Sequence, residues 1–174
     1  AIVKKGEAIS EGREDDEIIL LLDRTPFYAE SGGQVGDKGV IETETGLVRV
    51  SDTKKGSKDR ILHFAKVTEG WIGSGQSVVS RVNKGLRMDT ARNHTTTHIL
   101  HKALKEVLGE HVEQAGSLVS PERLRIDFQH YSGLTREELE LVENKVNDII
   151  LESLPVNIIE TTLNEAKKLG AIAL

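Results

Sequence analysis

The stretch RNHTTTHIL, residues 92 to 100, carries the side chains best suited to chemistry, because His94 and His98 stand four positions apart. On one face of a helix, this spacing lets two imidazole nitrogens reach a single zinc ion at about 2.0–2.1 Å. Thr95 occupies the position of the glutamate in a zinc protease of the H-E-x-x-H type, which argues against metalloprotease chemistry. The spacing alone leaves two interpretations open, half of a metal site or a solvated polar helix face.

Polar neighbours favour the metal interpretation. Helical rotation places Thr97 beside His94, so its hydroxyl is expected to face the same ligand. Asn93, Gln114 and Ser117 would add polar groups if the following strand runs back past the helix. Judged from its position alone, Gln114 is more typical of an ordinary surface residue of a strand.

The other histidines are weaker candidates. His101 is expected to share the polar face with the pair, together with Lys105, opposite an apolar stripe. Three more are expected on the surface or in packing roles: His63, His111 and His130.

The elements that position these residues change type along the chain. Residues 1–85 have short alternating runs separated by turn residues, a pattern typical of a small β-barrel. Its most irregular connection, TPFYAESGGQVGDKG, spans residues 25–39 and contains four glycines. This glycine-rich segment is interpreted either as a structural turn or as a mobile flap beside a binding site.

Residues 86–174 are predicted to form a second, α+β domain. A helix is expected over about 90–108, capped by Asp89 or Thr90 and ended by Gly109. Strands in VEQAGSLVS and RLRIDF follow, and then a helix opened by a capping box of Thr135 and Glu138. VNIIETTL is predicted as a strand, and NEAKKLGA as a short helix ended by Gly170.

Composition narrows the function classes. The 174 residues contain no cysteine, so His, Asp and Glu are the metal ligands available, and no apolar run is long enough to cross a membrane. A net charge of −5 argues against broad, nonspecific attraction to phosphates. The absence of cysteine suggests a cytoplasmic protein, and the lack of a signal peptide and of a starting Met suggests a piece of a longer chain.

Two long motifs give a more specific indication than the histidine spacing. DRTPFYAESGGQVGDKG and RNHTTTHILHKALKEVLGEHVEQAGSLVSPERLRIDF closely resemble the editing region of the alanyl-tRNA synthetase family. The resemblance covers nearly the whole chain in the right order. It implies a β-barrel joined to an α/β editing core that threonyl-tRNA synthetase and freestanding editing proteins share.

The resemblance also implies an activity and a site. The activity is hydrolysis of tRNA(Ala) wrongly charged with serine or glycine, within an ATP-dependent enzyme of protein biosynthesis. His94 and His98 match one pair of zinc ligands, and the second pair, C-x-x-x-H, has no counterpart before residue 174. Thr97 and Gln114 match residues of the editing pocket, and Gly32 and Gly33 match the flexible loop beside it.

Three hypotheses follow. The first is most of the editing domain of an alanyl-tRNA synthetase, with the tRNA(Ala) acceptor end and the remainder of the synthetase as partners. The second is a freestanding deacylase of the same superfamily. The third is a tRNA-binding or purely structural module without catalysis, whose histidines hold no metal. Basic residues near 54–60 and 81–87 are separate candidates for contact with tRNA phosphates.

Overall fold

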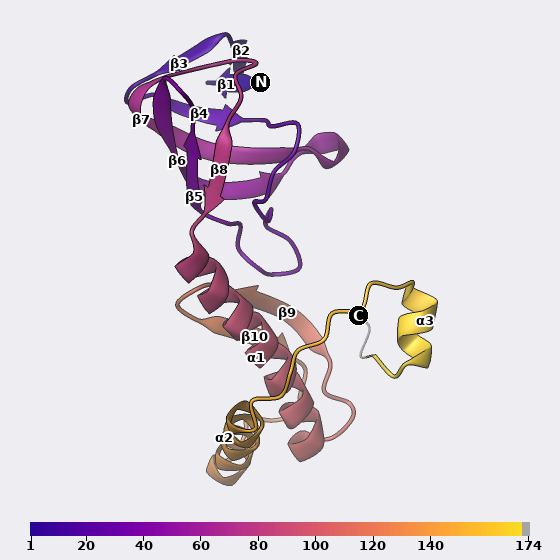
Figure 1. Ribbon diagram of the computed structural model, residues 1–174. Coiled ribbons are helices and arrows are strands. Elements are labelled where there is room, and N and C mark those ends of the chain that lie inside the picture. Colours follow the sequence, from indigo (N-terminus) through magenta and orange to yellow (C-terminus); the bar gives the residue numbers. More distant parts are fainter. Residues whose placement is uncertain (172–174) are drawn as a thin grey trace. The chain divides into compact units, whose positions relative to one another are not determined.

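The computed structural model describes residues 1–171, and its N-terminal part is one antiparallel sheet (Figure 1). The strands run in the order β2-β1-β4-β7-β6-β5-β8, with β3 paired to β7. Their bounds are β1 Ile2–Lys4, β2 Glu7–Ile9, β3 Glu11–Arg13, β4 Glu17–Leu20, β5 Gly39–Glu42, β6 Gly46–Lys55, β7 Ile61–Gly73 and β8 Val79–Val82. A single turn of 3₁₀ helix, Ser57–Asp59, separates β6 from β7.

The sheet curves around its own core but does not close. Ile2 of β1 and Ile41 of β5 belong to the same buried cluster, although three strands separate β1 from β5 in the sheet. Within the described residues, β2 and β8 remain at opposite ends of the strand order and do not pair. The predicted small β-barrel is therefore present only as a curved antiparallel sheet that is not closed between its end strands, and β1 and β2 at one end have only three residues each.

Helix α1, Lys84–Leu108, begins six residues before the predicted start. Asn83 supplies the cap, because its Oδ1 accepts a hydrogen bond from the Leu86 amide at 3.1 Å. The predicted cap Thr90 instead lies buried inside the helix, where its hydroxyl donates to the Leu86 carbonyl at 2.8 Å. Gly109, with a φ of +116°, ends the helix as predicted.

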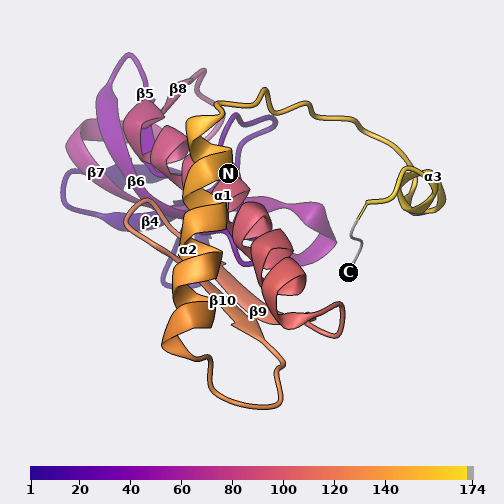
Figure 2. The same ribbon diagram turned by 90° about the horizontal axis from the view of Figure 1, so that it is seen from below.

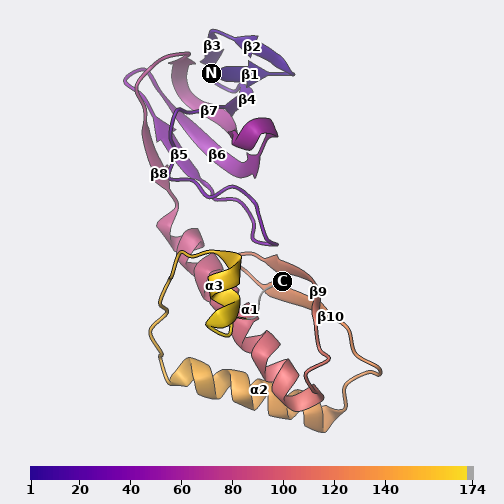
Figure 3. The ribbon, with the colours of Figure 1, turned by 90° about the vertical axis from the view of Figure 1, so that its right-hand side faces the viewer.

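Two strands and a second helix follow α1, as predicted. β9, Gln114–Val119, and β10, Leu124–Phe128, form a two-stranded sheet (Figure 3). Helix α2, Arg136–Leu151, has the expected capping box. The Thr135 hydroxyl accepts from the Glu138 amide at 3.2 Å, and the Glu138 carboxylate accepts from the Thr135 amide at 2.8 Å.

The chain divides into two compact units. The first contains residues 1–97 and 117–125, and the second contains residues 98–116 and those from 126 onward. In the second unit, α2 crosses α1 (Figure 2), and its Val142 packs in a cluster with Ala103, Leu104 and Val112.

His101 also lies in the second unit, and it is buried rather than on a polar face. Its Nε2 lies 3.3 Å from the Val112 carbonyl oxygen, which can only accept, so this nitrogen donates. The prediction that His101 shares a polar face with His94 and His98 is therefore wrong. Its imidazole is a satisfied core side chain, because its neighbours on the adjacent helical turns, Thr97 and Leu104, are buried as well.

The segment after α2 differs from the prediction. VNIIETTL forms no strand within the described residues, and most of its side chains are exposed, with Ile158 at 93%. Short helix α3, Leu163–Lys168, is capped by Thr162 and followed by Gly170 at a φ of +80°, as expected. No helix among residues 1–171 has the length and apolar character needed to cross a bilayer.

Candidate functional site

His94 is hydrogen-bonded to the glycine-rich segment, although 60 residues separate the two in sequence. Its Nδ1 lies 2.6 Å from Oε1 of Gln34. An amide oxygen can only accept, so Nδ1 must carry the proton in this contact. The structure thereby joins the two motifs that the sequence singled out.

The tip of the glycine-rich segment is a tight two-residue turn. Ser31 and Gln34 exchange backbone hydrogen bonds of 3.2 and 3.0 Å around Gly32 and Gly33. These glycines have φ angles of +57° and +79°, as a type I′ turn requires at both central positions. The glycine pair therefore sets the direction in which the chain leaves the turn at Gln34.

The same tip is held against the end of β9. Val119 donates to the Gly33 carbonyl at 2.8 Å, and its own carbonyl accepts from Val35 at 3.0 Å. A Cβ on Gly33 would lie 2.3 Å from the Ser117 hydroxyl oxygen, so only glycine permits this approach. Gly33 and Ser117 are thus in direct contact, and the backbone beside Gln34 is fixed.

An ion pair holds the stem of the glycine-rich segment. Asp37 is buried, and its carboxylate accepts from the Tyr28 amide at 2.6 Å and from Nε of Arg87 at 2.9 Å. Arg87, on α1, makes a second contact to the same carboxylate and donates to the Pro26 carbonyl at 2.8 Å. These hydrogen bonds to Asp37 raise the pKa of Arg87.

The side chains of Asn93 and Thr97 both donate hydrogen bonds to backbone carbonyls and not to each other. The Asn93 amide donates to the carbonyls of Ser120 at 2.8 Å and Pro121 at 3.2 Å. The chain after β9 thus does run back past this part of α1. Thr97 is buried, and its hydroxyl donates to the Asn93 carbonyl at 2.8 Å. Its oxygen lone pairs remain acceptors for a ligand.

The predicted site residues fall in both units. Gly32, Gly33, His94 and Thr97 belong to the first unit, and His98 and Gln114 belong to the second. His98 is exposed on α1, and partly exposed Gln114 opens β9. The structure brings Gly32 and Gly33 together with His94 through Gln34, a residue that sequence reasoning missed. The sequence feature that could have indicated Gln34 is its position directly after Gly32 and Gly33.

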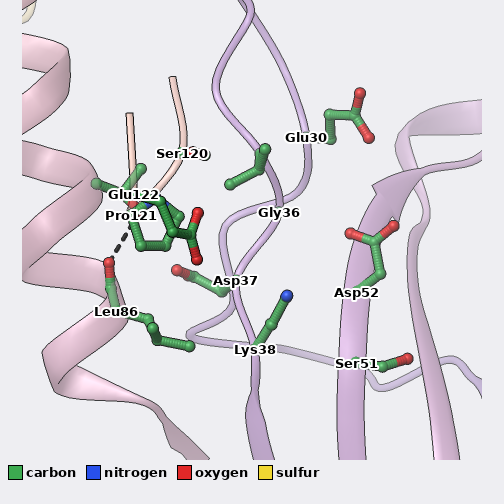
Figure 4. A pocket seen from close by; sticks show the side chains of 12 residues that line it. Glu30, Gly36, Asp37, Lys38, Ser51, Asp52, Leu86, Ser120, Pro121 and Glu122 are labelled. Carbon is green, nitrogen blue, oxygen red and sulfur yellow. Dashed lines mark hydrogen bonds between the residues drawn. The ribbon is translucent and has the colours of Figure 1, made fainter. Parts of the chain in front are cut away.

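Beside the stem lies a cavity of about 290 Å³ with a strongly acidic lining (Figure 4). Four carboxylates and one lysine line it: Glu30, Asp37, Asp52, Glu122 and Lys38. The pKa of Glu122 is lowered by its own backbone amide, by the Ser120 hydroxyl and, less strongly, by Lys38. Asp37 is paired with Arg87, and Asp52 and Glu30 lie near Lys54, so much of the negative charge of this lining is balanced by neighbouring cations.

The donor set of His94 and His98 suits zinc in its chemistry but does not complete a site. Two imidazoles on successive helical turns would supply two of the four ligands of a tetrahedral zinc ion. Among residues 1–171, no group of three or more His, Cys, Asp and Glu side chains is placed to hold a metal ion. A firm site would need further ligands in addition to this pair.

The remaining histidines have structural partners. His63 is fully buried, donates from Nδ1 to the Leu20 carbonyl at 3.0 Å and accepts from the Thr25 hydroxyl at 2.8 Å. Burial lowers the pKa of His63. His111 and His130 are hydrogen-bonded to each other at 2.9 Å, outside the glycine-rich segment and its contacts.

Most basic side chains considered for phosphate contact have acidic or hydroxyl partners. Lys54 lies 3.3 Å from Asp52 and 3.6 Å from Glu30, and these contacts raise its pKa. Lys55 donates to the Ser31 hydroxyl at 3.1 Å. Part of this positive charge is therefore neutralised within the chain.

Comparison with known proteins gives one family and several close relatives. Residues 1–86 match the family model of class II tRNA synthetases (A). The whole chain is similar to alanine–tRNA ligases, with 53% identity over 173 residues to that of Acetivibrio thermocellus and 51% over 173 residues to that of Caldicellulosiruptor saccharolyticus. The ligase of Bacillus velezensis is 50% identical over 173 residues. In each case 99% of this chain is covered but only 20% of the relative, so the chain spans about a fifth of their length.

Proposed function

We propose that this chain is most of the editing domain of an alanine–tRNA ligase, a cytoplasmic enzyme. In that setting it hydrolyses the ester bond of tRNA(Ala) mischarged with serine or glycine. The observation that carries the proposal is the 2.6 Å contact between His94 and Gln34. It unites the histidine helix and the glycine-rich segment in a chain that is about half identical to alanine–tRNA ligases along its whole length.

The chemical problem is to cleave the seryl ester and spare the alanyl ester, which differs by one hydroxyl. An apolar pocket discriminates poorly in this direction, whereas polar groups that bind the hydroxyl penalise the substrate that lacks it. Thr97 is suited to this task, because its proton is directed to the Asn93 carbonyl and its oxygen can accept from the substrate hydroxyl or ammonium.

His94 and His98 would hold zinc together with ligands from outside the described residues. When bound, zinc would polarise the ester carbonyl or lower the pKa of an attacking water to about 7. The chain's own residues would bind and orient the ester: Thr97 at the side chain of the amino acid, and Gln114 as a second polar group of the pocket. The acceptor end of tRNA(Ala) and the rest of the ligase are the proposed partners.

The function is tested in the complete ligase by following hydrolysis of Ser-tRNA(Ala). His94→Ala and His98→Ala are expected to reduce deacylation to near the uncatalysed rate and to lower the zinc content, while alanine activation is kept. Activity and zinc content that both persist in the two variants would exclude the ligand assignment. His130→Ala is the matched control, because His130 pairs with His111 instead.

A second variant tests how the substrate is chosen. Thr97→Val removes the hydroxyl with little change in shape and is expected to reduce the preference for seryl over alanyl esters by about 10-fold or more. The ratio of the two kcat/KM values measures this effect. An unchanged ratio would remove Thr97 from the discriminating role and leave it as a helix-packing residue.

A further inference from the structure

We infer that the segment after α2, residues 152–162, is a docking surface for a β-strand that another part of the same ligase polypeptide supplies. The inference rests on the proposed function in one respect only, that this chain is a piece of a longer ligase. It goes beyond editing, because it assigns an interaction to a segment that contains none of the candidate site residues.

This segment exposes large apolar side chains in close succession. Leu154, Val156, Ile158 and Ile159 are each at least 60% exposed. Folded proteins in water rarely leave so many neighbouring apolar side chains uncovered, and where they do, the patch usually marks a site of interaction. The segment is therefore expected to be covered when the chain is in its complete protein.

The backbone of the same segment also lacks partners. Within residues 1–171, no amide or carbonyl of residues 154–161 takes part in a backbone hydrogen bond. Covering the apolar side chains buries this backbone as well, so the occupant must bring hydrogen-bonding groups of its own. An added β-strand meets both needs, because its ladder pairs the backbone while its alternate side chains contact the apolar ones.

The sequence of the segment is suited to a strand with both faces covered. Val156 and Ile158 fall on one face of an extended chain, and Ile159 falls on the other. Val, Ile and Thr are favoured in strands, and apolar residues on both faces are typical of a strand inside a sheet. Pro155 stands at the start of the stretch, where a strand tolerates proline. The occupant that fits is a strand with apolar side chains.

The length of the relatives indicates where this strand comes from. The chain spans about a fifth of the alanine–tRNA ligases that it matches, so most of such a ligase lies outside it. A segment of the same polypeptide is held at an effective concentration in the millimolar range, which favours it over a free partner. A second copy is the poorer occupant, because the segment carries Glu152 and Glu160 and no basic residue, and two copies would bring like charges together. The fitting strand is flanked by Lys or Arg.

Cross-linking in the purified complete ligase identifies the occupant. A photoreactive benzophenone amino acid in place of Ile158 is expected to link to a peptide of the same polypeptide outside these 174 residues. A mixture of unlabelled and heavy-isotope-labelled ligase separates links within one polypeptide from links between two copies. The same amino acid in place of Glu143, which is exposed on α2, is the control and should not form this link. Links within the 174 residues, links between copies, or no link from position 158 would overturn the inference.

Hydrogen exchange in the complete ligase measures the added ladder. At least alternate amides of residues 156–161 are expected to exchange about 10-fold or more slowly than in an unstructured peptide of the same sequence. Ile158→Asp is expected to remove this protection, because it places a charge in the docking surface. Asn157→Asp adds the same charge at a polar position and should keep most of it, and alanine activation confirms that the rest of each variant is folded. Unprotected amides in the wild type, or the same protection in both variants, would contradict the added strand.

The two proposals fail in different ways. If the segment is protected and cross-linked as expected while hydrolysis of Ser-tRNA(Ala) does not depend on His94 or His98, the inference stands and the editing assignment falls. If hydrolysis depends on both histidines while residues 156–161 exchange freely, the proposed function stands and the inference about the segment is wrong.

Discussion

The glycine-rich segment, residues 25–39, and the segment after α2, residues 152–162, both lack regular helix and extended sheet, but they differ in how they are held. The first is rich in glycine, yet Phe27, Ala29 and Asp37 within it are buried. The second is rich in apolar residues, yet Ile158 and Ile159 are 93% and 71% exposed.

The difference teaches that contacts, rather than composition, decide which irregular segment has a fixed position. The glycine-rich segment is held by Arg87 at its stem, and by Val119 and His94 at its tip. Its glycines allow these close approaches and do not by themselves make it mobile. The apolar segment has a strand-like pattern, but a strand also needs a neighbouring strand to accept and donate its hydrogen bonds.

Removing the stem ion pair is expected to have the largest effect. Arg87→Ala would leave the buried Asp37 carboxylate without its cation, which costs about 3 kcal/mol of unfolding free energy, at the low end for a buried pair because Arg87 is partly exposed. Urea unfolding measures the loss. Arg81→Ala is the control, since its pair with Glu42 is exposed and should cost under about 1 kcal/mol. Equal losses would show that the stem pair does not hold the segment.

The two glycines of the turn should respond differently to the same change. Gly33→Ala combines a positive φ with a clash against Ser117 and is expected to cost about 2–3 kcal/mol, whereas Gly32→Ala has only the backbone strain and should cost about 1 kcal/mol. The difference in urea midpoints between the two variants checks this. If both cost the same, contact with Ser117 does not restrain the tip.

Lowering the pH is expected to destabilise the start of the glycine-rich segment, where Thr25 contacts His63. Thr25 donates to neutral His63, whose pKa is lowered by burial, so the unfolded state binds the proton more readily than the folded state. Stability from this group is fully present above the unfolded pKa of about 6.5 and declines as pH falls below it. The expected decline is about 1 kcal/mol per pH unit, and the slope should be smaller in His63→Gln. A slope that is the same in both proteins would contradict this.

The smallest effect is expected in the apolar segment. Ile158→Asp changes a side chain that is 93% exposed and should alter the unfolding free energy of this chain by less than about 0.5 kcal/mol. The same urea titration measures it, with Phe27→Asp as the buried counterpart in the glycine-rich segment. A loss above 1 kcal/mol for Ile158→Asp would remove the contrast between the two segments.

Local signals predicted the fold best. The capping box of Thr135 and Glu138 and the stop at Gly109 involve residues within one or two turns, and both are confirmed. The start of α1 was misplaced because Asn83 is also a good cap and the sequence provides several. Closure of the sheet and the pairing of VNIIETTL depend on distant partners, which periodicity does not encode.

The sequence predicted the types of residue at the candidate site but not the contacts between them. The histidines and glycines were found from spacing and motif, and their ligand and loop roles remain predictions. The contact of Gln34 with His94 joins positions 60 residues apart, so no local pattern indicates it. Arg87 belongs to the basic group near 81–87 that was considered for phosphate contact, and only the folded chain shows that it pairs with Asp37.

The hydrogen bond between Gln34 and His94 implies a thermodynamic reciprocity. If the order of the glycine turn improves zinc affinity by some factor, bound zinc must favour the ordered turn over its open forms by the same factor. The amides of Gln34 and Val35, which donate to Ser31 and Val119, should then exchange with deuterium more slowly when zinc is present. In Gln34→Leu that protection should no longer depend on zinc, so deuterium exchange at a turn without metal ligands would report whether zinc binds at the proposed site.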